Sequence, residues 1–516
     1  MMELRPYQQE AVEAVQREFG EGRTRTLLVM PTGTGKTPTA GALLDSEIRE
    51  HGSRGLFLAH RDELLTQAQG TFERAFSLPS ALEKAEQTSL GSPLPLTVAS
   101  VQTLCRETRL EQFPPGYFSE IVIDEAHHSL GESYRAVLEH FPSAKLVGIT
   151  ATPDRGDKRS LSALYDSVAY EYTMRQAVED GYLVPIRAKM LPLQADLRKA
   201  KVSCGDYTAS SVGEALEPFL EQAAGEMLTW CRGRKTVVFL PLVHIAKKFC
   251  ALLRSAGLRA AEVDGESEDR AEILAAFAAG EFDVICNSML LTEGWDCPSV
   301  DCVVVLRPTK VRSLYQQMVG RGTRLSPGKT ELLLLDFLYQ TEKHDLCTPA
   351  NAFGAESAVA EGVEKLLLSA DGALDLQEAE EKATRDVLRE REEALAAKLE
   401  TAALRKSKTV DPLQFALSIE AEDLAFYEPT FAWEFQAPTR KQLETLDRLG
   451  ISPASVRTRG YASLLIDRLI RRREAKLSTP RQIQCLQRCG FEHVSRWTFA
   501  QASSQIERLS QNNWRN

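Results

Sequence analysis

The chain has 516 residues, of which 43% are hydrophobic and 26% are charged, and its formal net charge is −10. This composition is typical of globular proteins with full cores, and the length predicts roughly three domains. No apolar run approaches the roughly 20 residues that span a bilayer, and the N-terminus lacks a signal-peptide pattern, so we expect no membrane contact and a cytoplasmic location. The ten cysteines are scattered without a CxxC pair, which argues against a zinc site.

Short β-branched runs alternate with helix-length segments through the first two thirds of the chain. Such runs predict buried parallel strands of doubly wound sheets. The pattern starts again after Pro185 and ends near Phe337. The runs are TLLVM, GLFLA, LTVASV, IVIDE and LVGIT in the first part and TVVFLP, DVICNS, VDCVVVL and LLLLDF in the second. We therefore predict two α/β lobes in series, at residues 1–175 and 176–345.

Residues 346–437 differ from the lobes in composition. The stretch Leu376–Glu400 is rich in Ala, Leu, Glu, Lys and Arg and has few helix breakers, which predicts a long exposed helix. A solvated helical spacer is the simplest interpretation of this region.

The last segment, 438–516, contains an internal repeat. Ten residues recur without a gap at an offset of 40 residues, and each copy predicts a helix, a glycine stop, a loop and a second helix. The repeated residues of the first copy are Thr439, Gln442, Leu446, Arg448, Gly450, Ala462, Ser463, Ile466, Arg468 and Leu469. The C-terminal region is therefore expected to be all-α.

The same segment is basic, although the whole chain is acidic. It carries 15 Lys and Arg against 6 Asp and Glu, a net charge of +9, so the rest of the chain carries −19. Such an asymmetry indicates local contact with nucleic-acid phosphates, and the stretch Arg468–Arg473 (RLIRRR) is the strongest candidate. A merely solvated basic tail fits the same charges.

The segment Met30–Thr37, MPTGTGKT, follows a predicted strand and precedes a helical pattern. Backbone amides of such a Gly-rich loop point inward and cradle phosphates at a helix N-terminus. Lys36 would reach the β- and γ-phosphates of ATP, and the Thr37 hydroxyl would bind Mg²⁺. The strict P-loop pattern has Gly where Met30 stands, so the match is incomplete at one position. The candidate phosphate-binding residues of the loop are Thr32, Gly33, Thr34 and Gly35.

Two adjacent acids follow the predicted strand IVID (Ile121–Asp124). Asp124 can hold Mg²⁺, usually through water, and Glu125 can orient and deprotonate an attacking water. Adjacent acids are common on protein surfaces. An acid pair at the carboxyl end of a buried strand, downstream of a P-loop, indicates ATP hydrolysis.

With these two segments the chain resembles the superfamily 2 helicases and translocases of the DEAD/DEAH-box class, with DEAH at Asp124–His127. The resemblance implies two tandem RecA-like lobes that use ATP and Mg²⁺. The segment Leu4–Val12, LRPYQQEAV, is similar to the adenine-reading segment of that class. It implies that Gln8 binds the base edge, because an amide both donates and accepts, with Arg5 or Tyr7 packed nearby.

Two further segments, LAHRDELLTQA and TVASVQTL, are similar to strand-end loops that contact the nucleic-acid backbone in that class, and a third, GITATPDR, matches its Ser/Thr-Ala-Thr segment. Thr150 and Thr152 of the third segment would link hydrolysis to strand binding. The phosphate contacts that the resemblance implies are made by His60, Arg61, Ser100, Gln102, Thr103 and Arg155.

The second lobe carries two more segments of the class. The stretch Leu290–Asp301 resembles its fifth motif and implies that four residues lie near the nucleotide and the nucleic-acid strand: Thr292, Glu293, Gly294 and Asp296. Within it, Trp295 is either a stacking surface for a base or a core residue, and the core is the better interpretation.

The stretch Tyr315–Arg324, YQQMVGRGTR, resembles the sixth motif and implies catalytic roles for Gln317, Arg321 and Arg324. An arginine delivered from another lobe stabilises the negative charge of phosphoryl transfer, and such a finger is worth roughly 10³- to 10⁵-fold in rate. Hydrolysis would then require the lobes to close. The family pattern places Arg324 nearest the γ-phosphate, with Arg321 beside it.

Within the superfamily, the segments look closest to the RadD-like and type I/III restriction-motor branch over about Leu4–Phe337. The Cys-rich zinc region of RadD-like proteins and the PD-(D/E)xK nuclease segment of restriction subunits have no counterpart in the sequence. The predicted function is an ATP-dependent DNA helicase or translocase, with repair or phage defence as its setting. The alternatives are an RNA helicase, a motor subunit whose partner supplies nuclease or loading function, and an ATP-gated clamp that does not unwind nucleic acid.

Overall fold

The computed structural model divides the chain into two compact units, Met1–Ala383 and Thr384–Asn516. The residues described are 3–151, 161, 163–203, 205–265, 267, 269–292, 294–340, 346–353, 355, 357–402, 409–429 and 433–511. Within these ranges, no helix is long and apolar enough to cross a membrane.

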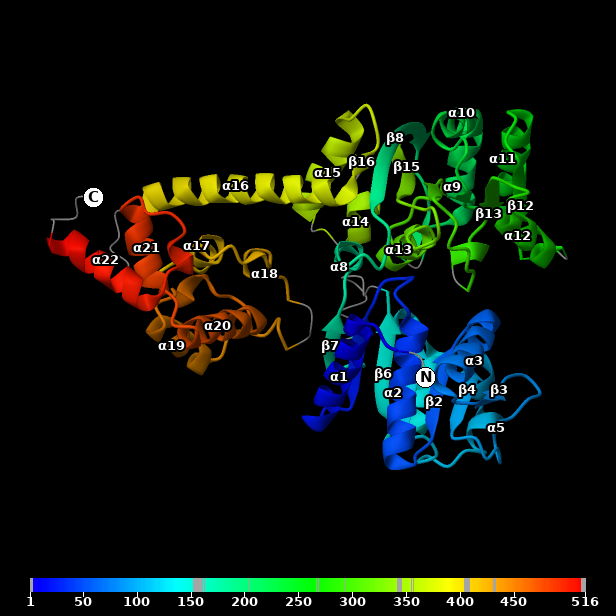
Figure 1. Ribbon diagram of the computed structural model, residues 1–516, viewed down its shortest axis with the longest axis horizontal. Coiled ribbons are helices and arrows are strands. Elements are labelled where there is room, and N and C mark those ends of the chain that lie inside the picture. The colour runs from blue at the N-terminus through cyan, green and yellow to red at the C-terminus, as the bar shows by residue number, and fades with distance from the viewer. Residues whose placement is uncertain are drawn as a thin grey trace. The chain divides into compact units, whose positions relative to one another are not determined.

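The first lobe of the unit Met1–Ala383 is built on a seven-stranded parallel sheet with the order β3-β4-β2-β5-β6-β1-β7 (Figure 1). All residues of β2, β4 and β5 are buried, which explains the unbroken apolar runs in their sequences. The helices α1, α2 and α3 pack against the strands. The strands are β1 (Arg25–Val29), β2 (Gly55–Ala59), β3 (Ser80–Glu83), β4 (Leu96–Ser100), β5 (Glu120–Asp124), β6 (Lys145–Thr150) and β7 (Ser167–Glu171), and the helices are α1 (Pro6–Gly20), α2 (Lys36–His51), α3 (Asp62–Phe76), α4 (Val101–Leu104), α5 (Glu107–Leu110) and α6 (Glu132–His140).

The second lobe has its own seven-stranded sheet with the order β12-β13-β11-β14-β15-β8-β16. Its strands pair in parallel except β16, which runs antiparallel to β8. The strands are β8 (Ile186–Asp196), β11 (Thr236–Phe239), β12 (Ala260–Val263), β13 (Val284–Asn287), β14 (Cys302–Val305), β15 (Leu332–Gln340) and β16 (Leu374–Asp375), with a separate ribbon of β9 (Val202–Ser203) and β10 (Asp206–Tyr207). The helices are α8 (Met174–Glu179), α9 (Ala209–Leu216), α10 (Leu220–Trp230), α11 (Val243–Ser255), α12 (Arg270–Ala279), α13 (Arg312–Gly320), α14 (Pro349–Phe353) and α15 (Ser357–Ser369).

The predicted fold class, two doubly wound parallel-sheet lobes followed by an all-α region, is confirmed. The second sheet extends further along the chain than the sequence pattern indicated, because α15 packs on β8 and β16 lies at the sheet edge. The first turn of α16 (Leu376–Ala402) is also anchored, since Leu376, Ala379 and Ala383 are buried. The domain boundaries at 175, 345 and 437 remain predictions.

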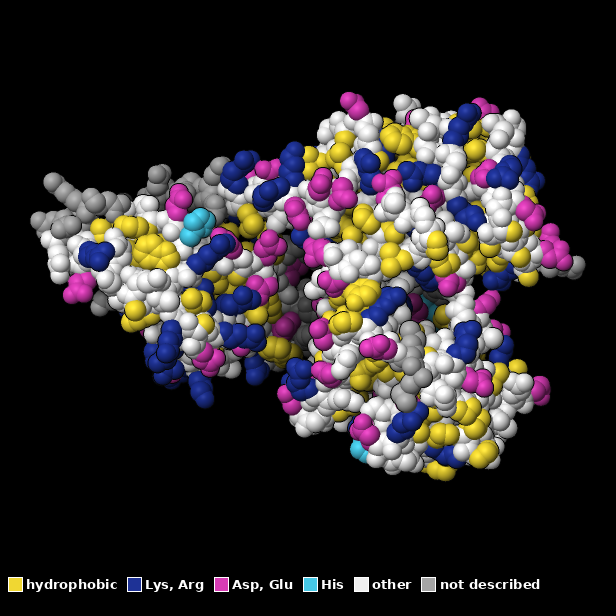
Figure 2. Space-filling model, viewed as in Figure 1, with side chains coloured by type: hydrophobic (Ala, Val, Ile, Leu, Met, Phe, Trp, Pro, Cys, Tyr) yellow, Lys and Arg dark blue, Asp and Glu magenta, His cyan; other side chains and the backbone are white. Residues whose placement is uncertain are grey.

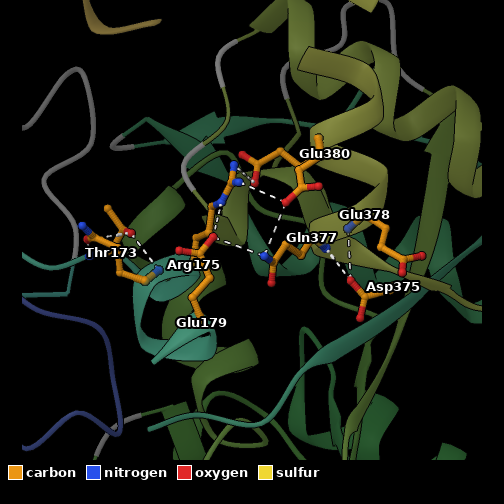
Figure 3. A network of polar contacts seen from close by, with 9 residues as sticks. Thr173, Arg175, Glu179, Asp375, Gln377, Glu378 and Glu380 are labelled. Atoms are coloured by element: carbon orange, nitrogen blue, oxygen red, sulfur yellow. Dashed lines mark hydrogen bonds and ion pairs between the residues drawn. The ribbon is translucent and has the colours of Figure 1, made fainter. Parts of the chain in front are cut away.

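A polar network ties α8, which connects the two sheets, to the beginning of α16 (Figure 3). Arg175 donates to Glu179 at 2.8 Å and forms ion pairs with Glu380 and Glu381 at 3.6 and 3.3 Å. The side-chain amide of Gln377 donates to Glu179 at 3.2 Å. The connection between the lobes is thereby fastened to the last elements of the second lobe.

The unit Thr384–Asn516 contains the repeat, and both copies have the predicted helix, glycine stop and helix. The first copy contains α19 (Arg440–Arg448) and α20 (Arg459–Glu474), the second α21 (Pro480–Arg488) and α22 (Phe499–Gln511), and α17 (Pro412–Ser418) and α18 (Glu422–Ala425) precede them. Gly450 and Gly490 end α19 and α21 with φ of +92° and +85°, which favours glycine.

A partly buried hydrogen bond is also duplicated in the two copies. Gln442 donates its amide to the Ser463 hydroxyl at 2.8 Å, and Gln482 donates to Ser503 at 2.8 Å. Each glutamine also closes a capping box with a threonine, Thr439 or Thr479. The recurring Thr, Gln and Ser of the sequence repeat are therefore structural residues.

Leu446 and Leu486 are equivalent in the two copies and both are fully buried in one core. We expect Leu446→Ala and Leu486→Ala each to lower the free energy of unfolding of the C-terminal unit by roughly 2–5 kcal/mol, because both leave a cavity. Calorimetry measures this as similar falls in one thermal transition. Glu444→Ala, at an exposed position of α19, is the control, and a loss confined to one copy would contradict a shared core.

Candidate active site between the lobes

The chemistry of the first lobe gathers at one edge of its sheet. β5, β6 and β1 are neighbours and run parallel, so the segments that follow them leave the sheet side by side. The register pairs Val29 with Thr150 and Asp124 with Ile149, and the Met30 amide donates to the Thr150 carbonyl at 2.9 Å. The P-loop, the acid pair and Thr150 therefore meet at the carboxyl ends of three adjacent strands.

The P-loop has the backbone that phosphate binding requires. Gly33 and Gly35 have φ of +91° and +83°, in the left-handed region that favours glycine, and α2 begins at Lys36. The Thr34 hydroxyl donates to the Pro31 carbonyl at 2.7 Å and closes the turn. The loop thus keeps its shape with a helix N-terminus behind it.

The acid pair faces the P-loop lysine. Lys36 Nζ lies 2.6 Å from Glu125 Oε1, and both side chains are largely buried. Asp124 is buried and its Oδ1 accepts the Glu125 amide at 3.0 Å. Glu125 itself has φ of +51°, a left-handed conformation uncommon outside glycine. The backbone therefore turns sharply to aim this carboxylate at Lys36.

His127 joins this cluster, a role that the sequence analysis did not predict. Its Nδ1 lies 3.5 Å from Glu125 Oε2 and 3.4 Å from the Thr150 hydroxyl. The histidine thus bridges the acid segment and the strand end of β6. Its place within DEAH was the only signal in the sequence.

Two buried polar atoms fit the requirements of a nucleotide site. Thr32 Oγ1 and Gln317 Nε2 have no hydrogen-bond partner among the described residues, although both are shielded from solvent. Such orphaned atoms are costly unless a ligand or water satisfies them. Thr37 and Asp124 supply the oxygen donors that Mg²⁺ prefers. The donor set therefore fits ATP with Mg²⁺.

The segment around Gln8 supports the P-loop directly. The Gln8 amide donates to the carbonyls of Thr34 and Gly35 at 3.2 and 3.3 Å, while its Oε1 accepts the Arg5 amide at 2.9 Å. The Tyr7 hydroxyl donates to Thr34 at 2.6 Å. These contacts place Gln8 beside the phosphate loop, and its adenine-reading role stays a prediction.

An aromatic cluster surrounds Tyr7 and was not predicted. Its ring stacks on Tyr172 with centroids 4.3 Å apart and meets the edge of Tyr182 at 4.9 Å. The Arg5 guanidinium lies 5.0 Å from the Tyr182 centroid. The cluster joins α1 to the segments on either side of α8. Isolated tyrosines without a spacing pattern gave no signal for it.

The second lobe touches the P-loop through the end of α13. A Cβ on Gly320 would lie 2.6 Å from the Thr32 Cβ, and one on Gly33 would lie 3.1 Å from the Arg324 Cγ. Arg324 also forms an ion pair with Asp296. The structure therefore brings together Thr32, Gly33, Asp296 and Arg324, which lie almost three hundred residues apart in sequence.

Arg321 and Arg324 have different surroundings. Arg321 is buried and donates to the Thr292 carbonyl at 2.6 and 3.0 Å and to the Trp295 carbonyl at 2.5 Å. It thereby holds the loop that contains Gly294 and Asp296. Trp295 is buried, which agrees with its interpretation as a core residue. Arg324 is the arginine that lies against the P-loop.

The candidate nucleic-acid residues form a second cluster on the first lobe. Ser100 donates to Gln102 at 2.7 Å, and the Gln102 amide donates to the His60 carbonyl at 2.7 Å. Thr103 instead accepts the Ala85 amide at 3.0 Å, and Arg61 immediately precedes α3. Thr152 and Arg155 lie outside the described residues. The strand-end loops after β2 and β4 are thus joined, and their contacts with nucleic acid stay predictions.

Helix α3 makes further contacts with the second lobe. The Gln67 amide donates to the Gly294 carbonyl at 2.6 Å, and Glu63 pairs with Arg270 at 3.3 Å. No sequence pattern predicted a role for these residues, because single polar residues on a helix surface are common. Gly294 is therefore held by the first lobe, on the side of α3.

Comparisons with known proteins agree with this arrangement. The family model described as type III restriction enzyme, res subunit, matches residues 1–155, and the helicase conserved C-terminal domain matches residues 221–326. The two matches fall on the two lobes in the expected order. The chain belongs to superfamily 2 of the helicases and translocases.

Relatives within superfamily 2 come from yeast and bacteria. A candidate ATP-dependent helicase of Saccharomyces cerevisiae, IRC3, is 30% identical over 65% of this chain and 51% of its own length. The type I restriction enzyme EcoKI endonuclease subunit of Escherichia coli is 29% identical over 64% of this chain and 34% of its own. The chain thus spans about half or less of these relatives, and the resemblance to restriction motors is confirmed.

A solved structure within superfamily 2 supports the fold. The fragment of a type I restriction HsdR subunit from Vibrio vulnificus is 27% identical, covers 64% of each chain and has a TM-score of 0.52. The two lobes of this chain thus share the fold of that fragment.

The different surroundings of the two arginines predict different effects on stability. We expect Arg321→Ala to lower the free energy of unfolding by a few kcal/mol, because it leaves buried carbonyls of Thr292 and Trp295 without donors. Arg324→Ala removes one partly exposed ion pair and should cost at most about 1 kcal/mol. Urea titration of both variants measures the difference, and equal losses would contradict it.

A buried acid behind α13 predicts a pH dependence. Burial raises the pKa of Asp336 from 3.8 to about 7, although Tyr315 of α13 donates to it at 2.6 Å. An acid whose pKa is higher in the folded state adds most stability below pH 3.8 and loses this contribution as pH rises towards 7. At 1.36 kcal/mol per pKa unit the loss is on the order of 4 kcal/mol. Asp336→Asn should lose less stability than the wild type between pH 4 and pH 8 in urea titrations, and identical slopes would contradict this.

Proposed function

We propose that the chain is an ATP-dependent motor that translocates on or remodels DNA. The observation that carries the proposal is that the P-loop is contacted from two directions. Lys36 pairs with Glu125 of its own lobe, while Gly320 and Arg324 of the other lobe lie against Thr32 and Gly33. A nucleotide in the loop would therefore contact both lobes, so that binding and hydrolysis change the force between them.

Each residue then has a defined task. Lys36 and the loop amides bind the phosphates, and Thr37 and Asp124 hold Mg²⁺, which would neutralise phosphate charge. Glu125 orients the attacking water and accepts its proton, with His127 in a position to fix the carboxylate. Arg324 stabilises the charge that develops on the transferred phosphoryl group. Arg321 acts as a positioning residue, since it holds the loop of Gly294 and Asp296.

DNA is the favoured track because the relatives that match include type I restriction enzyme subunits. Nucleic-acid stimulation of the ATPase is part of the proposal. The phosphate-facing loops after β2 and β4 discriminate poorly between DNA and RNA, so an RNA motor is the alternative. A second alternative is a motor subunit whose partner supplies nuclease or loading function, since the relatives that match include subunits of type I restriction enzymes.

Steady-state ATPase assays with single-stranded DNA, duplex DNA and RNA test the proposal. We expect DNA to stimulate turnover, and Lys36→Ala and Glu125→Gln to abolish it without loss of the fold. Arg324→Ala should slow hydrolysis by about 10³-fold, the lower end of the effect of an arginine finger.

Lys84→Ala, which removes a lysine paired with Asp62 away from the P-loop, is the control and should leave turnover unchanged. Near-normal turnover in Lys36→Ala or Glu125→Gln would overturn the motor. If RNA stimulated ATP turnover and DNA did not, the result would favour an RNA motor over a DNA motor. A strand-displacement assay separates unwinding from translocation or clamping.

A further inference from the structure

The unit Thr384–Asn516 contains a cavity of about 830 Å³ at the seam between the two repeat copies. The ends of α19 and α20 form one side, and the beginnings of α21 and α22 form the other. Its volume lies within the range of roughly 300–1,000 Å³ that is typical of ligand sites. The cavity is separate from the ATP site, which the unit Met1–Ala383 contains.

The wall of the cavity is positively charged. Arg448, Arg472, Arg473 and Lys476 line it, and the described lining includes no acidic residue. Dark blue Lys and Arg side chains gather over α19 and α20 in Figure 2. The neighbouring Asp467 is already paired with Arg471 at 2.8 Å. The cavity therefore attracts anions.

Arg472 brings a partly buried positive charge to this wall. Its guanidinium donates to the carbonyls of Ser495 and Ser478 at 2.7 and 3.3 Å, and its Nε is buried without a partner in the described part of the chain. Burial and the nearby Arg468 lower the pKa of Arg472. A partly buried cation that contacts only neutral groups is costly, and a bound anion relieves that cost.

Two helices also point their N-termini at the cavity. Thr479 caps α21, and Thr498 occupies the equivalent position before α22, where its hydroxyl accepts the Gln501 amide at 3.3 Å. The N-terminus of a helix carries a partial positive charge that favours phosphate. Both helix ends therefore add to the field of the four basic side chains.

One aromatic ring is left open at the mouth of this site. Phe499, the first residue of α22, is 51% exposed although Leu449 and Leu469 beside it are partly or fully buried. Single-stranded nucleic acid binds to surfaces that combine basic grooves with exposed aromatic faces, on which unpaired bases stack. A duplex offers no free base face. A planar membrane cannot enter a recessed cavity.

We propose that this cavity binds single-stranded nucleic acid, with phosphates on Arg448, Arg473 and Lys476 and one base on Phe499. The site is an additional contact beyond the motor core, and its existence does not depend on ATP turnover. It gives the basic repeat a task, to hold a strand while the lobes cycle.

The proposed site recognises the phosphates of the strand and does not distinguish the base sequence or ribose from deoxyribose. The hydroxyl protons of Ser478, Thr479 and Thr498 are used within the chain, on Val494, Gln482 and Gln501 at 2.7–3.1 Å. These three hydroxyl protons are therefore already donated within the chain and do not distinguish RNA from DNA by its 2′-hydroxyl. DNA and RNA strands should bind this cavity equally well.

Fluorescence anisotropy of the full chain without nucleotide, with labelled 20-residue oligothymidine, tests the proposal across salt concentrations. The double variant Arg473→Glu/Lys476→Glu should bind at least tenfold more weakly, with a salt slope lower by about 1.4, from about 0.7 for each lost phosphate contact. Phe499→Ala should weaken binding about fivefold or more with an unchanged slope, because stacking does not release counterions. Phe499→Tyr keeps the ring and should bind like the wild type.

Arg471→Glu is the control for Arg473→Glu alone, since both reverse one charge on α20, the first outside the cavity and the second in its wall. If Arg471→Glu weakened the binding of oligothymidine as much as Arg473→Glu does, the loss would come from overall charge and not from the cavity. That result would overturn the proposed site. The proposal would also be overturned if the double variant bound oligothymidine as tightly as the wild type. It would likewise be overturned if the double variant bound phosphatidylserine vesicles more weakly but bound oligothymidine unchanged. Oligouridine should bind with the affinity of oligothymidine. All these variants should keep the ATPase rate measured without nucleic acid, so failure of this site and failure of the motor are distinguishable.

Discussion

The carboxyl ends of neighbouring parallel strands lie at one edge of a sheet, and the candidate active site of this protein depends on that constraint. β5, β6 and β1 are neighbours, so Asp124, Thr150 and the P-loop leave the sheet together. The ion pair of Lys36 with Glu125 at 2.6 Å is a direct result. The strands hold these side chains rigidly because they are buried on both faces. In the proposed motor, the second lobe completes this rigid part of the ATP site.

The second lobe contributes to the candidate site through hydrogen bonds to backbone carbonyls as well as through a charged side chain. Arg321 uses its guanidinium on the carbonyls of Thr292 and Trp295, which leaves Arg324 as the arginine beside the P-loop. Of the two arginines three positions apart, Arg321 thus supports the neighbouring loop, and Arg324 is the one proposed to act as the arginine finger. The network of Arg175 with Glu179, Glu380 and Glu381 similarly fastens the connecting helix α8 to the second lobe (Figure 3).

The sequence was sufficient to predict those candidate site residues that lie at the end of a strand. Lys36, Asp124 and Glu125 were predicted because each follows a recognisable apolar run. The strand β8 was missed because Arg187, Lys189 and Pro192 interrupt its pattern, and Lys189 is accommodated by donating to the Ala370 carbonyl.

Other features had no sequence signal at all. The partners of Gln8 and Arg321 are backbone carbonyls, which no residue pattern encodes. The tyrosine cluster around Tyr7 and the contacts of α3 with Gly294 arise only when distant segments fold together. Local spacing therefore predicts the candidate reacting groups, and tertiary packing decides which of the predicted residues instead hold neighbouring segments in place.

Gly320 leaves no room between the second lobe and the P-loop. A single methyl group at this position would lie within 2.6 Å of the Thr32 Cβ. Atoms already in contact cannot approach further, so any displacement of Thr32 towards α13 must move the helix as well. The absent side chain therefore lets α13 pack directly on the P-loop, and any larger residue at this position would force the two lobes apart.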